Sequence, residues 1–131
     1  MGLFAILVIV VGILGYVRLA PTDPVRWHVP VIADADKDMP GGAIRVVRVG
    51  PDALALVDEA ARGFERTQVL AGSVEQGRVT YVSRSKLIGF PDYTTVEQDG
   101  DVLKIHARLR FGRSDLGVNR ARVLKLLAAL P

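Results

Sequence analysis

The feature that most limits the fold is an apolar run at the start of the chain. Leu3 to Val17 holds only apolar residues and glycine, and the first charged side chain is Arg18. About twenty helical residues span the roughly 30 Å hydrocarbon core of a membrane. A helix without a polar face suits lipid better than the core of a small domain. The sequence therefore predicts a transmembrane anchor over residues 1–20, followed by one domain.

Cleavage and orientation of this segment can also be argued from its flanks. A cleaved signal peptide, the main alternative, would have basic residues before Leu3 and small residues at the cut, where Arg18 and Pro21 stand instead. Arg18 and Arg26 follow the segment with Asp23 between them. The positive-inside rule, counted literally, therefore leans toward a cytoplasmic domain by a narrow margin.

Composition removes several classes of function. The chain has no cysteine, which excludes disulfides, thiolate nucleophiles and thiolate metal sites. Residues 21–100 carry 9 basic and 12 acidic groups, whereas residues 101–131 carry 7 basic and 2 acidic groups. This asymmetry predicts a basic face on a nearly neutral domain.

Residues 21–44 are predicted to form a proline-rich strap and a loop. PTDPVRWHVP places three prolines in ten positions, a density that excludes a helix and favours extended chain. Trp27 is expected to pack this strap onto the domain, with anchoring at the membrane interface as the alternative. The following DADKD resembles the start of a calcium loop. Met39 and Arg45 occupy the positions that need glycine and glutamate, so no metal is expected there.

Residues 45–131 are predicted to fold as one globular α+β domain. A short strand-like stretch precedes a helix whose apolar residues recur from Leu54 to Phe64, with Pro51 at its start and Gly63 at its end. From Thr67 the apolar period changes to two, and four strand segments follow in two hairpins. A closing helix completes a two-layer fold of about four antiparallel strands, with one sheet face covered by two helices.

The second hairpin and the closing helix set the neighbours of the charged residues. A two-residue turn at Asp99-Gly100 would place Tyr93 opposite His106. The basic residues of the last strand then form one outward row: Lys104, His106, Arg108 and Arg110. Ser114 or Asp115 is suited to cap the closing helix. Its expected buried residues are Leu116, Val123, Leu127 and Leu130, and its expected outward residues are Asn119, Arg122 and Lys125.

Candidate ligand-binding residues gather in two segments, 84–93 and 110–122, which the hairpin brings together. With the row on the last strand they are Arg84, Asp92, Tyr93, His106, Arg108, Arg110, Arg113, Ser114, Asp115 and Asn119. Guanidinium groups beside the start of a helix suit phosphate or carboxylate, so an anion site is predicted. In the alternative interpretation, Asp92 and Asp115 neutralise these arginines and order the loops.

No residue is assigned a catalytic role. Ser83 or Ser85 could combine with His106 and Asp92 as a hydrolytic triad, but no G-x-S-x-G turn is present. The two histidines have no further ligand at suitable spacing, so neither a metal nor a cofactor is expected. Nucleic acid is not expected either, because only Tyr93 offers a stacking ring beside the basic row.

Two stretches, RVTYVSRSKLIGFPDY and ARLRFGRSDLGVNRARV, resemble the signature blocks of a bacterial and plastid family, domain of unknown function 1499. DPVRWHVP is similar to members with one N-terminal anchor. The resemblance implies an envelope protein, since plastid relatives are associated with the thylakoid lumen, which is equivalent to the periplasm. It thus implies a single-pass protein of the bacterial inner membrane with a periplasmic domain. Ala107 and Leu109 stand where the family would have serines, which puts a role for hydroxyl groups there in doubt.

The function favoured by the sequence is a membrane-anchored, non-catalytic envelope protein. It is expected to bind an anionic ligand or a protein partner through its arginine-rich corner, and to contact membrane lipids through residues 1–20. An anionic lipid or a small anion would suit the corner. An accessory subunit of a larger inner-membrane complex is the alternative, and a small hydrolase is the second alternative.

Overall fold

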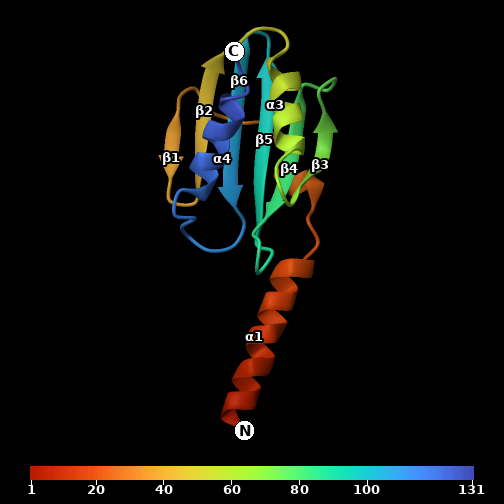
Figure 1. The fold of residues 1–131 in the computed structure, drawn as a ribbon, viewed down its shortest axis with the longest axis vertical. Helices are drawn as coiled ribbons and strands as arrows, with labels where there is room; N and C mark the ends of the chain where they lie inside the picture. Colours follow the sequence, from red (N-terminus) through yellow and green to blue (C-terminus); the bar gives the residue numbers. More distant parts are fainter.

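A projecting helix and an α+β domain make up the fold (Figure 1). The computed structural model describes residues 1–131. Its elements are α1 (Gly2–Leu19), α2 (Pro24–Trp27), β1 (Lys37–Met39), β2 (Gly42–Arg48), α3 (Ala53–Arg62), β3 (Thr67–Ser73), β4 (Arg78–Arg84), β5 (Pro91–Asp99), β6 (Val102–Leu109) and α4 (Val118–Leu127). Helices α3 and α4 lie on one face of the sheet, and α1 extends away from one end of the strands.

The sheet has six antiparallel strands rather than the predicted four. Their order is β1-β2-β6-β5-β4-β3. The two additional strands lie before α3: β2 pairs with β6 along its whole length, and the three-residue β1 pairs with β2. The apolar pattern of β2 identifies a strand, but its partner lies far along the chain. This non-local pairing leaves no turn signal in the sequence, which is why β2 was not counted in the sheet. β1 joins β2 through a short turn at Pro40-Gly41, and its three residues lie in the segment predicted as loop.

The hydrophobic core lies between the sheet and the two helices. Its buried residues are Ala43, Leu54, Val57, Ala61, Val79, Tyr81, Val96, Leu103, Ile105, Ala107, Val123 and Leu126. The predicted buried face of α3 is thereby confirmed, and Gly63 ends this helix as expected. Tyr81 reaches across the core to donate a hydrogen bond to Asp58, and burial is the main reason that the pKa of its hydroxyl is raised.

The β5–β6 hairpin differs from the predicted register by two residues. Its turn is Gly100-Asp101, so Tyr93 lies opposite Arg108 rather than His106. Gly100 has a φ of +61°, and a glycine at the first turn position adopts that conformation without strain. An even shift leaves each side chain on its predicted face. The basic row therefore does lie on the face opposite to the core.

Most of the predicted inward face of α4 is confirmed, because Leu127 and Leu130 pack partly buried against the core. Val123 is buried as expected, but Asn119 is 0% exposed, whereas Leu116 is 94% exposed and precedes the helix. The predictions for Leu116 and Asn119 were therefore wrong. The Asn119 amide can be buried because it is hydrogen-bonded to Asp92 and Arg122.

The strap, residues 21–31, crosses the sheet face that the helices leave open. Trp27 stacks on Tyr93 with the two ring centroids 4.1 Å apart. Further along, Val31 is buried, and its backbone N–H donates to the carboxylate of Glu97. These contacts confirm that Trp27 packs the strap onto the domain, which gives the sheet a covering layer on each side.

The strap is not fully extended, contrary to expectation. Residues Pro24–Trp27 form the single helical turn α2. Pro24 occupies the first helical position, where its missing N–H has no cost, and the Asp23 carboxylate accepts a hydrogen bond from Val25 N at 3.0 Å. The density of prolines excludes a long helix but allows one capped turn.

Helix α1 is apolar and exposed along most of its length. Its 18 residues have a mean hydropathy of 2.4, and 6% of them are buried. By length and composition this helix can cross a membrane, a property that it shares with signal sequences. Its last turn touches the domain, because Tyr16 packs edge-on against Phe111 with ring centroids 6.2 Å apart and Val17 is buried.

Replacing Trp27 with alanine tests whether the strap is an integral layer of the fold. The change removes the ring that stacks on Tyr93. Because Trp27 is only partly buried, we expect the free energy of unfolding to fall by about 2 kcal/mol, below the range for a fully buried tryptophan. Val25 lies on the same strap and is 83% exposed, so Val25→Ala should change it by less than about 0.5 kcal/mol. Similar denaturation midpoints for the two variants would contradict this role.

Candidate functional site

The predicted site residues are divided between the two faces and one end of the sheet. Tyr93, His106, Arg108 and Arg110 belong to the strap side, whereas Asp92, Ser114, Asp115 and Asn119 lie on the side of α4. Arg84 and Arg113 lie at the strand end that faces α1. Neighbouring residues of a strand point to opposite faces, so Asp92 and Tyr93 cannot serve one pocket. A single corner that contains all ten residues is not formed.

Arg108 is the main polar contact between the sheet and the strap. Its guanidinium donates to Thr95 Oγ1 at 2.9 Å, to the His106 carbonyl at 3.0 Å and to the Trp27 carbonyl at 2.6 Å. Burial lowers its pKa to about 10, so the group remains charged at neutral pH. Its bonded acceptors all belong to the protein itself, which makes Arg108 part of the scaffold.

Arg110 fastens the first residues of the strap. Its Nη1 donates to the Pro21 carbonyl at 3.1 Å and to the Tyr93 hydroxyl at 3.2 Å. The same hydroxyl lies 2.9 Å from Thr22 Oγ1. The strap is therefore held from its first residue, directly after the end of α1.

His106 lies on the strap side of the sheet, away from the other residues of the hydrolytic triad that the sequence could have formed. Burial, followed by the charge of Arg108, lowers its pKa to about 4. Ser83 is hydrogen-bonded to a threonine of β3, and Ser85 accepts two backbone hydrogen bonds within its own loop. Asp92 lies on the opposite face of the sheet. The structure thus does not bring these groups into a chain of hydrogen bonds.

The helix side holds a compact ionic network. Asp92 Oδ2 accepts from Asn119 Nδ2 at 3.2 Å and from Arg122 Nη1 at 3.4 Å. Burial raises the pKa of Asp92, and the charge and hydrogen bonds of Arg122 oppose that rise. The N-cap of α4 is Gly117 rather than the expected Ser114 or Asp115, but Asp115 still accepts from N–H groups at the helix start, from Gly117 N at 2.9 Å and from Asn119 N at 3.0 Å. Both carboxylates are thus engaged by protein groups.

The strap, the FPDY segment and the SDLGVNRAR segment form one connected structure around β5 and β6. A family model described as "Protein of unknown function (DUF1499)" matches residues 20–130. The chain belongs to the DUF1499 family. The matched region begins at the strap and leaves α1 outside. A search of curated proteins found no match.

In this DUF1499 domain, the loops of both signature segments lie at the end of the sheet nearest α1 (Figure 1). We call this region, with Arg18, loop 85–90 and loop 110–117, the anchor-side end. The β4–β5 loop rests against α1, since a Cβ on Gly89 would lie 3.3 Å from Arg18 Cγ. The two loops also enclose a hollow of about 410 Å³, lined by residues that include Ser85, Phe90, Asp92, Phe111, Ser114 and Arg122.

The arginines of the DUF1499 domain and of α1 fall into two groups. Ion pairs with carboxylates are formed by Arg45, Arg48, Arg62, Arg66, Arg78, Arg120 and Arg122. The arginines without such a partner are Arg18, Arg26, Arg84, Arg108, Arg110 and Arg113. All of the second group lie in the last turn of α1, in the strap or in the signature segments. Unneutralised guanidinium charge is therefore concentrated toward α1.

The aspartates of the calcium-like loop serve an ion pair instead. Asp38 Oδ1 lies 2.7 Å from Arg45 Nη1, and this hydrogen bond holds the pKa of Asp38 below its usual value. Asp36 accepts from Val46 N at 2.8 Å. No group of three His, Asp or Glu side chains is arranged to hold a metal ion.

Sequence reasoning missed several residues of this region. Trp27 was expected to pack the strap, but not to cover Arg108, and Arg122 was expected to point outward. Arg122 follows Asn119 by three positions, the spacing that places two side chains on one helix face, so the pair could have been recognised. Arg18 and Lys86 become neighbours only through the fold, and no local signal reveals them.

Arg108→Met should destabilise the domain far more than Arg113→Met. Removing the Arg108 guanidinium takes the 2.6 Å donor from the Trp27 carbonyl, which keeps only a 3.4 Å contact with Thr95 Oγ1. An unsatisfied buried acceptor costs about 1–3 kcal/mol, so we expect the free energy of unfolding to fall by about 2–3 kcal/mol. Arg113 is exposed and unpaired, and its loss should have an effect below about 0.5 kcal/mol. Unchanged cooperative melting of Arg108→Met would show that Arg108 is no scaffold residue.

Mild acid should destabilise the domain through its histidines. The pKa of His106 is lowered from 6.5 to about 4, and that of His28 is lowered by burial and by Arg78. The unfolded chain then binds more protons than the folded one in this window. The contribution of the neutral histidines to the free energy of unfolding is therefore complete above pH 6.5 and is lost as the pH falls toward 4. Allowing for screening by water, we expect the free energy of unfolding to fall by about 1 kcal/mol between pH 7 and pH 5.

The matched variant is His28→Gln combined with His106→Gln, which removes both titrations. Its melting temperature should depend less on pH between 7 and 5 than that of the wild-type protein. Asp92 acts in the opposite sense, because its raised pKa lets the folded state hold a proton at acidic pH. An identical pH dependence in the variant and the wild type would refute the assignment to histidine.

Proposed function

We propose that the protein is a single-pass membrane protein whose domain binds anionic groups at its anchor-side end without catalysing a reaction. We place the domain on the periplasmic surface of the bacterial inner membrane. The length and composition of α1 support a membrane span. The resemblance of the signature segments to envelope and thylakoid-lumen proteins supports the periplasmic side. The observation that carries the proposal is the concentration of unpaired arginines toward the anchor.

The free donors at this end define where an anion can bind. Arg108 and Arg110 are bonded to strap carbonyls, and Arg26 lies 5.0 Å from the Trp27 ring centroid. Arg18, Arg113 and the neighbouring Lys86 form no ion pair, and Arg84 makes one hydrogen bond, to a backbone carbonyl. Basic side chains near an anionic membrane surface contribute about 1 kcal/mol each. This is the chemistry expected of a surface that rests on anionic headgroups.

Two further observations favour contact with the membrane itself. Leu87 and Leu116, which lie in the two loops of the anchor-side end, are 86% and 94% exposed. Exposed leucines beside cations are typical of segments that enter the interface of a bilayer. The strap is bonded from Pro21 onward, so the domain is held close to the end of α1.

Limited trypsin digestion of the full-length protein in nanodiscs tests this placement. We expect cleavage after Lys86 and Arg113 to be several-fold slower in nanodiscs with phosphatidylglycerol than in nanodiscs of phosphatidylcholine alone. Cleavage after Arg48, whose side chain is 81% exposed at the opposite end of the sheet, should proceed equally in both. High salt should restore cleavage, because it screens surface charges. Equal protection in the two lipids would contradict the proposal.

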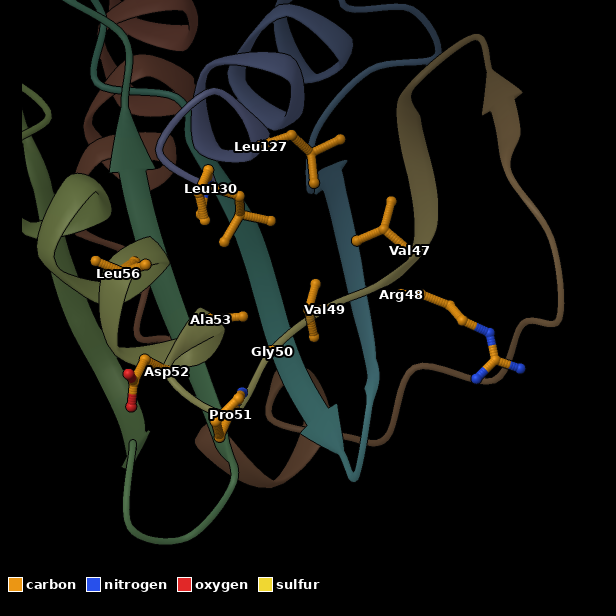
Figure 2. A pocket seen from close by; sticks show the side chains of 11 residues that line it. Val47, Arg48, Val49, Gly50, Pro51, Asp52, Ala53, Leu56, Leu127 and Leu130 are labelled. Atoms are coloured by element: carbon orange, nitrogen blue, oxygen red, sulfur yellow. The ribbon is translucent and has the colours of Figure 1, made fainter.

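An accessory subunit is the second candidate, and one observation favours it. A hollow of about 590 Å³ lies at the end of the domain opposite to α1, between β2, the start of α3 and the chain end. Figure 2 shows Val47, Val49, Leu127 and Leu130 around it. An apolar hollow directed away from the membrane suits a side chain of a protein partner. Migration as a free monomer after purification in mild detergent would count against this candidate.

A further inference from the structure

We propose that a pocket beside the end of α1 binds a phosphate group. The inference rests on the proposed membrane-surface function and names the ligand chemistry of its anchor-side end. The pocket has a volume of about 250 Å³ and is called the basic pocket here. Its lining residues are Arg18, Arg66, Gln68, Val82, Arg84, Ser85, Lys86 and Gly89.

The four cations of the basic pocket come from separate parts of the chain. Arg18 lies in the last turn of α1, Arg66 directly precedes β3, Arg84 ends β4, and Lys86 follows in the loop. Antiparallel pairing places the start of β3 beside the end of β4. The contact of Gly89 with Arg18 then brings the anchor to the same place. Tertiary structure thus assembles a positive site that no sequence motif announces.

The charge of the basic pocket is largely unneutralised. The one carboxylate paired with any of its cations is Glu65, which lies 3.1 Å from Arg66 Nη1 and is 84% exposed. Arg84 uses Nη1 to donate to the Gly89 carbonyl at 3.0 Å, which leaves its Nη2 without a partner. Like charges this close repel one another, and a bound anion would offset that repulsion. Guanidinium forks match phosphate oxygens in geometry as well as in charge.

The pocket is preorganised by hydrogen bonds of its own backbone. Ser85 Oγ accepts from Gly89 N at 3.1 Å and from Phe90 N at 2.9 Å, which closes the loop that carries Lys86. Arg66 Nε donates to the Arg84 carbonyl at 3.1 Å, and Arg84 N donates to the Arg66 carbonyl at 2.9 Å. Two of the four cations are thus fixed before any ligand arrives, which lowers the entropic cost of binding.

The position of the pocket agrees with the phosphate layer of a membrane. Arg18 ends an apolar helix of 18 residues, which is about 27 Å long and close to the thickness of the hydrocarbon core. The small volume suits one phosphate group rather than a nucleotide. A lipid phosphodiester and free inorganic phosphate share this chemistry, so the experiment must separate the two sources.

The experiment uses the full-length protein in a non-ionic detergent. Native mass spectrometry measures binding of phosphatidylglycerol, with phosphatidylcholine as the zwitterionic comparison, and thermal unfolding with added inorganic phosphate measures binding of the free anion. Arg84→Gln combined with Lys86→Gln should weaken phosphatidylglycerol binding at least tenfold, since each change removes a charge-assisted contact. Arg48→Gln combined with Lys37→Gln removes the same charges at the far sheet edge and should change binding less than twofold.

The outcomes distinguish a lipid phosphate from free phosphate, and they distinguish failure of the pocket from failure of the proposed function. A lipid site is supported if only phosphatidylglycerol binds and if that binding depends on Arg84 and Lys86. A soluble anion is supported if added phosphate raises the melting temperature of the wild-type protein but not that of the double variant. Equal binding of both probes by wild type and variant overturns the pocket. Lys86→Glu, at an exposed residue without hydrogen bonds, gives the same test if the double variant does not fold. If the pocket is overturned but trypsin cleavage is still slower on anionic nanodiscs, the proposed function stands without the pocket. If that protection is also absent, both the pocket and the proposed function are contradicted.

Discussion

The contact on which the rest of the structure depends joins the Arg108 guanidinium to the Trp27 carbonyl at 2.6 Å. A buried guanidinium is costly unless acceptors surround it, and the strap supplies the one that the sheet lacks. The Trp27 ring meanwhile covers Tyr93. The second sheet face therefore forms only with the strap in place, which agrees with a family match that begins at residue 20. The strap is thus part of the domain.

The attachment of the strap to the sheet also fixes the position of the domain relative to α1. Arg110 bonds Pro21, and Tyr16 in the last turn of α1 packs against Phe111. Between these two contacts there is too little free chain for the domain to swing away. The anchor-side end therefore stays near the end of α1, and so do the free cations there. A flexible linker would have given the same residues no fixed position relative to α1.

Local sequence patterns predicted most helices and strands correctly. They predicted poorly which strands pair and which buried polar groups bond to one another. The buried face of α3, the hydrogen bonds of Asp115 at the start of α4 and the packing of Trp27 all follow from residues close in sequence. The pairing of β2 with β6 and the burial of Asn119 depend on groups that are distant in sequence. The apolar pattern of α4 correctly placed Val123, Leu127 and Leu130 against the core, but it could not predict that the Asn119 amide would be buried with its hydrogen-bond partners.

The candidate site divided for the same reason, and the division shows where a ligand can be added. On the α4 side Asp92 is matched by Arg122, and on the strap side Arg108 is matched by carbonyls. An anion at either place would have to displace a contact that holds the fold together. Beside Arg18, the hydrogen bonds of Arg66 and Arg84 leave Arg84 Nη2 free, so the proposed anion would neutralise charge without displacing a contact of the scaffold. Residues that are adjacent in the signature segments therefore contact different parts of the fold. The cations that form no scaffold contact are the ones that the proposed anion could bind.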